Sequence, residues 1–280
     1  MTTDRIETIG SCRLQHGPLS CRVYLMHLSG NPEAAVDTME RLASANGYDK
    51  LFAKVPGQKL SVFLDRGFVV EARIPNFYAD GDEAVFAARF LSEKRSRAAD
   101  RKRIQGVLEA AQQKAGEGLR RPLPAGYRVL RLREAEAEAM AALYARVFET
   151  YPFPVFDPAY IRRTMAGSFR YFGVIRKGTL TAVASAEMEG LGAEMTDFAT
   201  EGAFRSVGLA GHLLSALEED VRKRGIRTAF TIARSRSFGI NVLFSRAGYR
   251  FAGTLVNNTN ISGRIESMNI WYKSLANDRG

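Results

Sequence analysis

A short loop of small residues follows a strand-like segment and precedes a helix-like segment, at Arg205-Ser-Val-Gly208-Leu-Ala210-Gly211. Gly208, Ala210 and Gly211 would allow backbone N–H groups to approach a ligand closely. These groups would lie at the N-terminus of a helix, where the partial positive charge favours phosphate. The loop therefore predicts a pyrophosphate-binding site, although an ordinary strand-to-helix turn could have the same composition.

The segments around this loop predict an α/β unit that begins near residue 121. The prolines of Arg121-Pro-Leu-Pro124 cannot continue the preceding helix. We therefore divide the chain into an N-terminal α/β domain at 1–92, a charged helical linker at 93–120 and a second domain at 121–280. In the second domain, hydrophobic periodicity predicts strands at 127–133, 169–175, 179–188, 193–200, 226–233, 249–256 and 267–274, and helices at 134–148, 159–165, 208–224 and 240–246.

One segment of the N-terminal domain is similar in sequence to a segment of the second domain. Gln58-Lys-Leu-Ser-Val-Phe-Leu-Asp-Arg-Gly67-Phe68 parallels Val242-Leu-Phe-Ser-Arg-Ala-Gly248-Tyr249, and strand-like segments at 51–55, 68–78 and 84–91 surround it. A helix is expected at 32–45, but no glycine-rich phosphate loop precedes it. We predict a degenerate, non-catalytic copy of the second domain. An unrelated α/β cap is the alternative.

Composition limits the classes of function. The hydrophobic content of 46% is ordinary for a globular protein, and no apolar run is long enough to cross a bilayer. Cys12, Cys21 and three scattered histidines give no metal-ligand spacing, so we expect no metal, and free thiols in the cytoplasm. The net charge of +10 is concentrated in part at 93–103. That segment has no interleaved aromatic residues, so we expect a solvated helix rather than nucleic-acid binding, and no membrane partner.

The order of these motifs resembles that of the GCN5-related N-acetyltransferases. Arg205, Gly208 and Ala210 fill the family's Gln/Arg-x-x-Gly-x-Gly/Ala acetyl-CoA motif, and Leu243 to Tyr249 is similar to its Leu-Tyr-x-x-x-Gly-Phe signature. The resemblance implies an α/β fold with a mixed, mostly antiparallel central sheet flanked by helices. It implies acetyl-CoA as cosubstrate, bound between the fourth and fifth strands. The expected cofactor-binding residues are Phe198, Ala199, Thr200, Arg205, Val207, Gly208, Leu209, Ala210 and Gly211, with Asn241 and Phe244 further along the chain.

Acetyl transfer to an amine also requires a base for the ammonium and a route for the leaving thiolate. Glu194 and Asp197 on the 193–200 strand are the candidate bases, and strict alternation would place them on opposite faces of the strand. Either could instead bond to a neighbouring strand. Where many family members have a tyrosine acid, this chain has Phe244, so another hydroxyl serves or the thiolate leaves unassisted. Asn241 is expected to bind cofactor or substrate, or to cap a helix.

A polar segment at 256–272 is expected at the substrate end. Its side chains could hold a small zwitterion, because Arg can clamp a carboxylate and Glu an ammonium. A hairpin rich in Asn and Gly is the alternative. The candidate substrate-binding residues are Asn257, Asn258, Thr259, Arg264, Glu266 and Asn269, together with Tyr151.

Four blocks in this part of the chain resemble the bacterial and archaeal β-lysine Nε-acetyltransferases. They are the residues at 194–200, 255–259 and 266–273, and Tyr151-Pro-Phe-Pro154. The resemblance implies acetylation of the ε-amine of β-lysine to the compatible solute Nε-acetyl-β-lysine, with a small-molecule amine as partner and a possible homodimer. The alternatives are a polyamine, an aminoglycoside or a protein lysine as substrate, or a non-enzymatic acetyl-CoA sensor.

Overall fold

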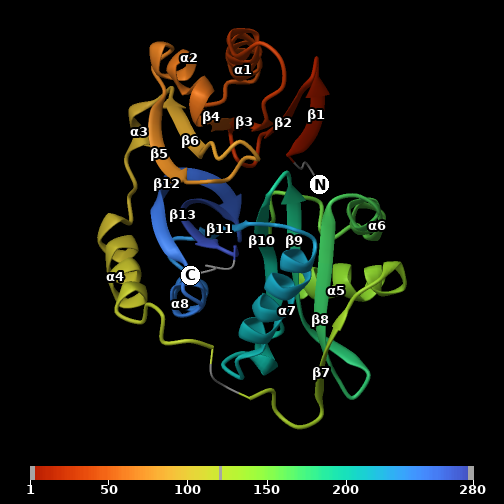
Figure 1. Ribbon diagram of the computed structural model, residues 1–280. Coiled ribbons are helices and arrows are strands. Elements are labelled where there is room, and N and C mark those ends of the chain that lie inside the picture. Colours follow the sequence, from red (N-terminus) through yellow and green to blue (C-terminus); the bar gives the residue numbers. More distant parts are fainter. Residues whose placement is uncertain (1–3, 120–121, 277–280) are drawn as a thin grey trace.

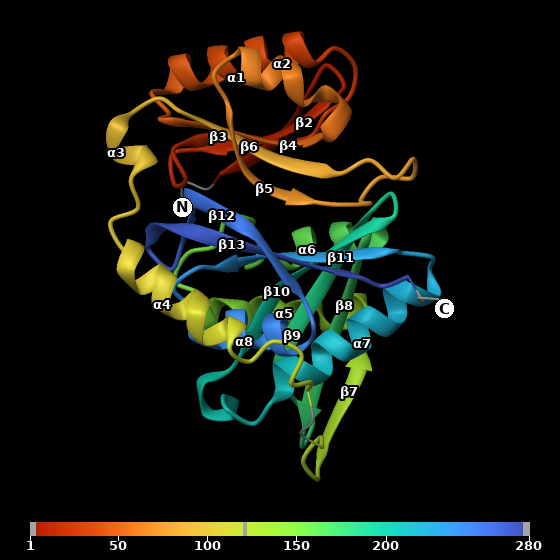
Figure 2. The ribbon, with the colours of Figure 1, turned by 60° about the vertical axis from the view of Figure 1, so that its left-hand side comes forward.

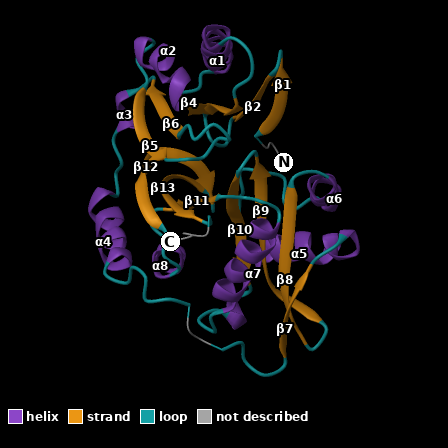
Figure 3. Ribbon diagram, viewed as in Figure 1, coloured by secondary structure: helices purple, strands orange, loops and turns teal. Residues whose placement is uncertain are grey.

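The computed structural model describes residues 4–119 and 122–276 and contains one mixed, mostly antiparallel sheet. The order of its thirteen strands is β1-β2-β3-β4-β6-β5-β12-β13-β11-β10-β9-β8-β7. Figure 3 shows helices around this sheet, as the acetyltransferase resemblance implies. Within the described residues, no helix is long and apolar enough to span a membrane.

The N-terminal half supplies the first six strands of the sheet. An antiparallel β1–β2–β3 arrangement precedes α1, and β4 then pairs parallel with β3. The elements are β1 (Arg5–Ile9), β2 (Cys12–Gly17), β3 (Arg22–His27), α1 (Pro32–Asn46), β4 (Lys50–Pro56), α2 (Leu60–Asp65), β5 (Val69–Ile74) and β6 (Ala84–Phe90). The first three strands were not predicted from the sequence.

The charged segment after β6 is two helices rather than one. α3 (Glu93–Ser96) ends at Arg97, whose backbone is extended, and α4 (Arg101–Gln112) begins after it. The side chain of Asn257 donates to the carbonyl oxygens of Arg95 and Arg97, which fixes this break. α4 packs Ile104, Leu108 and Ala111 inward and lies beside α8, as Figure 1 shows. Part of the segment is therefore packed against the second half.

The C-terminal half follows the order predicted from periodicity. Its elements are β7 (Tyr127–Arg131), α5 (Ala137–Val147), α6 (Pro158–Ala166), β8 (Phe169–Arg176), β9 (Thr179–Glu189), β10 (Gly192–Thr200), α7 (Leu209–Lys223), β11 (Thr228–Arg234), α8 (Phe238–Arg246), β12 (Arg250–Ile261) and β13 (Arg264–Ser274). The last two strands are longer than predicted and meet at a turn at Ser262 and Gly263. Much of the polar 257–266 segment is therefore strand rather than loop.

The two halves share one arrangement of elements. The series β3-α1-β4-α2-β5-β6 has the same strand neighbours as β10-α7-β11-α8-β12-β13. The two segments of similar sequence also match locally, since Phe63 lies edge-on to Phe68 just as Phe244 lies edge-on to Tyr249. This correspondence supports the prediction of a second, degenerate copy, which remains a hypothesis about the origin of the half.

The N-terminus of α1 differs from that of α7 in a way that explains the missing phosphate site. Gly208 precedes α7 with φ +91°, whereas Asn31 caps α1 in an extended conformation. The Asn31 side chain accepts the backbone N–H of Glu33, so one amide donor at this helix end is already used. The Glu33 carboxylate would also repel an anion there.

The halves join edge to edge and then pack face to face. β5 pairs with β12 where Gly253, with φ +151°, lies opposite Ala72, and a Cβ at Gly253 would lie 2.0 Å from the carbonyl oxygen of Glu71. Only glycine allows that approach. An apolar cluster including Phe52, Phe86, Phe230 and Ile270 fills the space between the two faces. Figure 2 shows the N-terminal strands above β11–β13, with α1 and α2 on the far side.

Candidate active site

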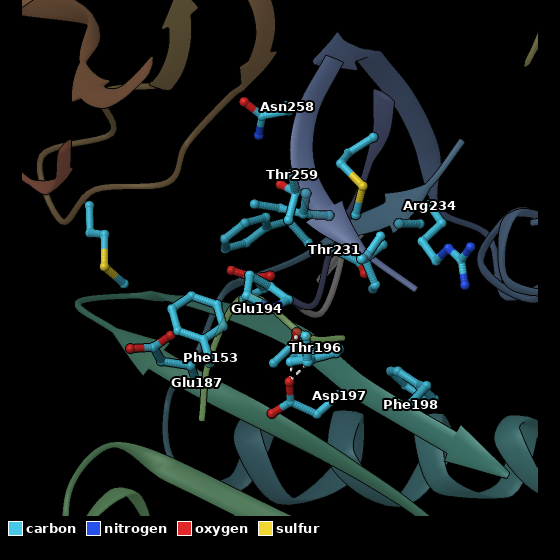
Figure 4. Close-up of a pocket in the computed structure, with 18 of the residues that line it drawn as sticks. Phe153, Glu187, Glu194, Thr196, Asp197, Phe198, Thr231, Arg234, Asn258 and Thr259 are labelled. Carbon is cyan, nitrogen blue, oxygen red and sulfur yellow. Dashed lines mark hydrogen bonds between the residues drawn. The ribbon is translucent and has the colours of Figure 1, made fainter. Parts of the chain in front are cut away.

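A cavity of about 670 Å³ lies between the two halves. β9, β10, β11 and β12 of the C-terminal half line it, together with the loop at 147–153. The N-terminal half closes it with side chains of β2, β3 and β4, including Arg13, Arg22, Tyr24 and Lys54. Figure 4 shows the cavity walls, with Glu194, Thr196 and Asp197 on one side and Asn258 and Thr259 on another.

The strands β10 and β11 separate at this cavity. Backbone pairing joins residues 192–194 of β10 to 228–230 of β11, yet β10 continues to Thr200 and β11 to Arg234. No further pairing joins these two described segments, so a slot opens between them. The slot lies between the fourth and fifth strands of the C-terminal half, where the family resemblance places the acyl arm of acetyl-CoA.

The predicted pyrophosphate loop follows β10. Gly208 takes a left-handed conformation directly before α7, and no side chain caps the first backbone N–H groups of that helix. The Nε of Arg205 donates to the carbonyl oxygen of Thr200 at 3.3 Å, which joins the loop to the end of the strand. Leu209 and Gly211 are buried, while Val207 and Ala210 are partly exposed. These features fit a phosphate group.

A β-bulge brings both candidate bases to one cavity. The pairing of β10 with β9 shifts register between Thr196 and Ala199, and Asp197 takes φ +55°. Without the bulge, alternation would direct Asp197 to the opposite face from Glu194, as the sequence analysis expected. With it, both residues line the cavity, and the extra residue interrupts the backbone ladder beside them.

The environment of Glu194 favours its protonated form. Burial and the nearby Glu187 carboxylate raise the pKa of Glu194 to about 8, while Lys54 opposes the shift. Glu187 lies directly across the strand pair, and burial raises its pKa as well. A carboxyl group with a pKa near neutrality is matched to proton transfer at physiological pH.

Asp197 is held by hydroxyl donors. Tyr151 Oη donates to its Oδ1 at 2.7 Å, and Ser185 Oγ donates to its Oδ2 at 2.5 Å. Burial raises the pKa of Asp197, and the hydrogen bonds from Ser185 and Tyr151 oppose that shift. With both oxygens engaged, Asp197 has less capacity than Glu194 to accept a proton from a ligand. It anchors the loop that carries Tyr151.

Asn241 and Phe244 lie inside the fold. The Asn241 amide donates to the carbonyl oxygens of Arg234 and Ser237, and its Oδ1 accepts from Asn269 and Trp271. Its hydrogen-bonding capacity is thus used by the protein, so the expected ligand role is wrong. The helix-cap alternative is wrong too, because Asn241 lies within α8 and Ser237 is the N-cap residue. Phe244 is fully buried between Phe198 and Tyr249. Phe198 itself lines the cavity, and Ala199 faces the core.

The predicted substrate residues divide into two groups. Tyr151, Asn258 and Thr259 line the cavity. The remaining four bond other side chains and backbone groups of the protein. Asn257 bonds the α3 segment, Asn269 bonds Thr254 and Asn241, and Arg264 pairs with Glu266. Arg234 binds the same Glu266 carboxylate through two hydrogen bonds, and these cations hold its pKa below the ordinary value despite burial.

Sequence reasoning missed the cavity residues of the N-terminal half. Arg22, Tyr24 and Met26 alternate with the core residues Val23 and Leu25 along β3. That alternation was a usable signal for a strand with one face on a site. Lys54, within the otherwise apolar β4, was another.

Comparison with curated proteins identifies the family. The chain is 34% identical to the β-lysine N6-acetyltransferase of Methanococcus maripaludis over 96% of this chain and 98% of that protein. The chain belongs to this family of N-acetyltransferases. N-acetyltransferase YodP of Bacillus subtilis is 32% identical over 94% and 95% of the two chains. The β-lysine N6-acetyltransferase of Methanosarcina mazei is 30% identical over 89% and 100%.

Family membership confirms the acetyltransferase prediction, and the match spans both halves of the chain. No protein-family model matches the chain. Among solved structures, an N-acetyltransferase of Staphylococcus aureus Mu50 aligns with a TM-score of 0.49 at 16% identity, over 54% of this chain and 100% of that one. The Escherichia coli ribosomal-protein-S18-alanine N-acetyltransferase aligns with a TM-score of 0.47 at 19% identity, over 55% and 98%.

Proposed function

We propose that this N-acetyltransferase transfers the acetyl group of acetyl-CoA to the ε-amine of β-lysine. Two of the curated relatives bear the name β-lysine N6-acetyltransferase, and they match the chain nearly end to end. The observation that carries the proposal is Glu194, a cavity carboxyl with a pKa of about 8, next to the slot between β10 and β11.

The residues around the slot fit acetyl-CoA. Gly208 and the first turn of α7 offer backbone N–H groups to the pyrophosphate, and Arg205 adds a positive charge. Bound acetyl-CoA supplies the activated acetyl group. The backbone of Phe198, Ala199 and Thr200 at the end of β10 would flank its acyl arm, next to the bulge that interrupts the pairing of β10 with β9.

Glu194 acts as the base in this proposal. It takes one proton of the distal ammonium, and the freed amine nitrogen bonds the acetyl carbon as the C–S bond breaks. The nitrogen then loses its second proton to the departing thiolate, which gives the neutral amide and CoA thiol. The thiolate leaves without help from position 244, because a buried phenyl ring has no proton to give. The ordinary pKa of a thiol, about 8.5, permits such a departure. The hydrogen bond between Tyr151 and Asp197 joins the loop that carries Tyr151 to β10 at the cavity wall.

The product would be neutral overall, because acetylation removes one positive charge from a molecule with two ammonium groups and one carboxylate. Such a zwitterion suits accumulation as a compatible solute in the cytoplasm. We expect no role for nucleic acid or a membrane in this reaction, and a homodimer remains a prediction.

Product analysis tests the proposal. The purified protein, given β-lysine and acetyl-CoA, should release one CoA per amine consumed, and NMR should place the acetyl group on N6. Acetylation at N3, or no CoA release with β-lysine under conditions where acetyl-CoA binds, would contradict it. α-Lysine is the matched comparison, and we expect lower kcat/KM for it than for β-lysine.

A further inference from the structure

Arg22 is a buried cation that pairs with no carboxylate in the part of the chain that the structure describes. Its side chain lines the cavity, and the residue is 3% exposed. Nη1 donates to the carbonyl oxygen of Asn258 at 2.9 Å and to Thr259 Oγ1 at 3.0 Å, and Nη2 donates to Gln15 Oε1 at 3.1 Å. All three acceptors are neutral. Within residues 4–119 and 122–276, no carboxylate lies within 4.0 Å of this guanidinium, and its Nε has no hydrogen-bond partner.

A buried guanidinium without a paired carboxylate is costly, because desolvation is only partly offset, here by the more distant charges of Asp4 and Glu71. Burial lowers the pKa of Arg22 to about 10, so the group remains charged at neutral pH. Its carbon atom lies 5.1 Å from the ring centre of Tyr24 and 5.4 Å from that of Phe52, and these rings supply part of the compensation. An anionic ligand in the cavity would supply the rest.

The other cations at the cavity are already occupied or exposed. Lys54 pairs with Glu189, and Arg234 binds Glu266 with two hydrogen bonds. The side chain of Arg13 is 42% exposed, with a 3.5 Å contact to Glu187. Arg22 is therefore the cavity cation best suited to receive a carboxylate.

Asn258 provides the complementary group beside Arg22. Its residue is 1% exposed and lines the same cavity, and its Oδ1 has no hydrogen-bond partner among the described residues. A buried amide oxygen of this kind can accept a hydrogen bond from an ammonium. A donor for a carboxylate and an acceptor for an ammonium thus lie next to each other, one from each half of the chain.

We propose that Arg22 and Asn258 form the subsite for the amino-acid head of the substrate, with Arg22 holding the carboxylate and Asn258 Oδ1 accepting from the adjacent ammonium. The inference rests on the proposed function. It assigns the N-terminal half a direct role in substrate choice, because that half supplies the carboxylate's partner. The distal amine then reaches towards Glu194 on the β10 wall, which Figure 4 shows across the cavity from Asn258 and Thr259.

Two analogues of β-lysine separate the two contacts. 1,4-Diaminopentane lacks the carboxylate alone, and 6-aminohexanoate lacks the 3-amino group alone. The wild-type protein should prefer β-lysine to both in kcat/KM. Arg22→Gln should lower kcat/KM for β-lysine by about 100-fold, the scale of losing one partner of a buried charge pair, and leave that for 1,4-diaminopentane unchanged. Asn258→Leu keeps the backbone carbonyl that holds Arg22. It should lower kcat/KM for β-lysine and leave kcat/KM for 6-aminohexanoate unchanged.

Arg95→Gln is the matched control. Arg95 is equally buried and contacts the Asn258 carbonyl, but it pairs with Asp49 and does not line the cavity. Its loss should lower stability and leave the preference for β-lysine intact. Acetyl-CoA binding by each variant shows that the fold is retained. If Arg22→Gln does not fold, the Asn258→Leu series and Arg22→Lys, with its weaker single-point contact, provide the same comparison.

The outcomes distinguish a failure of the proposed function from a failure of the proposed subsite. A wild-type protein that binds acetyl-CoA but acetylates none of the three amines contradicts the proposed function. A wild-type protein that prefers β-lysine, with the same preference in Arg22→Gln and Asn258→Leu, overturns the subsite and leaves the function standing. Equal wild-type kcat/KM for β-lysine and 1,4-diaminopentane also overturns it.

Discussion

Glu194 on β10 and Glu187 on β9 are directly opposed across an antiparallel strand pair, so two carboxylates face one another at the cavity. Opposed like charges destabilise a strand pair and favour protonation of one partner. After burial, Glu187 is the largest cause of the raised pKa of Glu194. Glu187 therefore helps to bring the pKa of Glu194, the proposed base, close to neutral pH.

Replacing Glu187 should therefore move the pH dependence of the reaction. Glu187→Gln removes the neighbouring negative charge, so the pKa of Glu194 falls and the rising limb of kcat/KM moves to lower pH. Profiles measured over roughly two pH units on either side of the raised pKa of about 8 would detect it. Glu219→Gln, which alters an exposed residue of α7, should leave the limb in place. A limb unmoved by Glu187→Gln would contradict the coupling.

The raised pKa of Glu194 should also make the stability of the fold depend on pH. The pKa of Glu194 is higher in the folded protein than its ordinary value of 4.5, so folding favours the protonated carboxyl. That contribution is present below about pH 4.5 and is lost as the pH rises through about 8. Glu194→Gln should have a higher Tm than wild type at pH 8.5, with a smaller difference at pH 5. Equal differences at both values would argue against a raised pKa.

Asp197 should matter for stability as well as for rate. Asp197→Asn leaves an amide N–H facing either the Tyr151 or the Ser185 hydroxyl, so one buried donor loses its acceptor. The expected cost is about 1–3 kcal/mol of unfolding free energy, measured by denaturant titration. Ser185→Ala, which removes one donor and keeps the carboxylate, should cost less. A variant of wild-type stability with kcat reduced like that of Glu194→Gln would instead give Asp197 the role of base.

Gly208 tests the cofactor loop. Its φ of +91° is unfavourable for a β-branched residue, and a side chain there would crowd a bound pyrophosphate. Gly208→Val should weaken acetyl-CoA binding severely in calorimetry. Gly202→Val is a nearby control, because Gly202 has ordinary backbone angles and a Cβ there meets no atom within 4 Å. Wild-type affinity in a folded Gly208→Val protein would reject the phosphate-loop assignment.

The order of helices and strands in the C-terminal half could be predicted from the sequence, because amphipathic helices and alternating strands dominate it. The loop around Gly208 could be predicted because its composition is distinctive. It could not reveal the bulge at Asp197, since a single residue with positive φ leaves no trace in periodicity. The polar 257–266 segment looked like a turn because Asn and Gly favour turns. In the structure those side chains bond neighbouring elements, as Asn257 does with the α3 segment.

The N-terminal contribution to the cavity was harder to foresee. It depends on the two halves packing face to face, which brings β3 against β12 and β2 against the loop at 148–153. These contacts join residues far apart in the chain. Arg22 and Gln15 illustrate this, since Gln15 Nε2 donates to the carbonyl oxygen of Pro152 at 2.6 Å and its Oε1 accepts from Arg22. Such partners follow from the topology rather than from local spacing.

The central claim is that Glu194 is the base for acetyl transfer to the distal amine, and the pH profile of kcat/KM for wild type and Glu194→Gln with β-lysine tests it most directly. We predict a wild-type limb near pH 8 that the variant lacks, with kcat lower by about 100-fold or more. A variant that keeps the wild-type kcat and the same limb would contradict it.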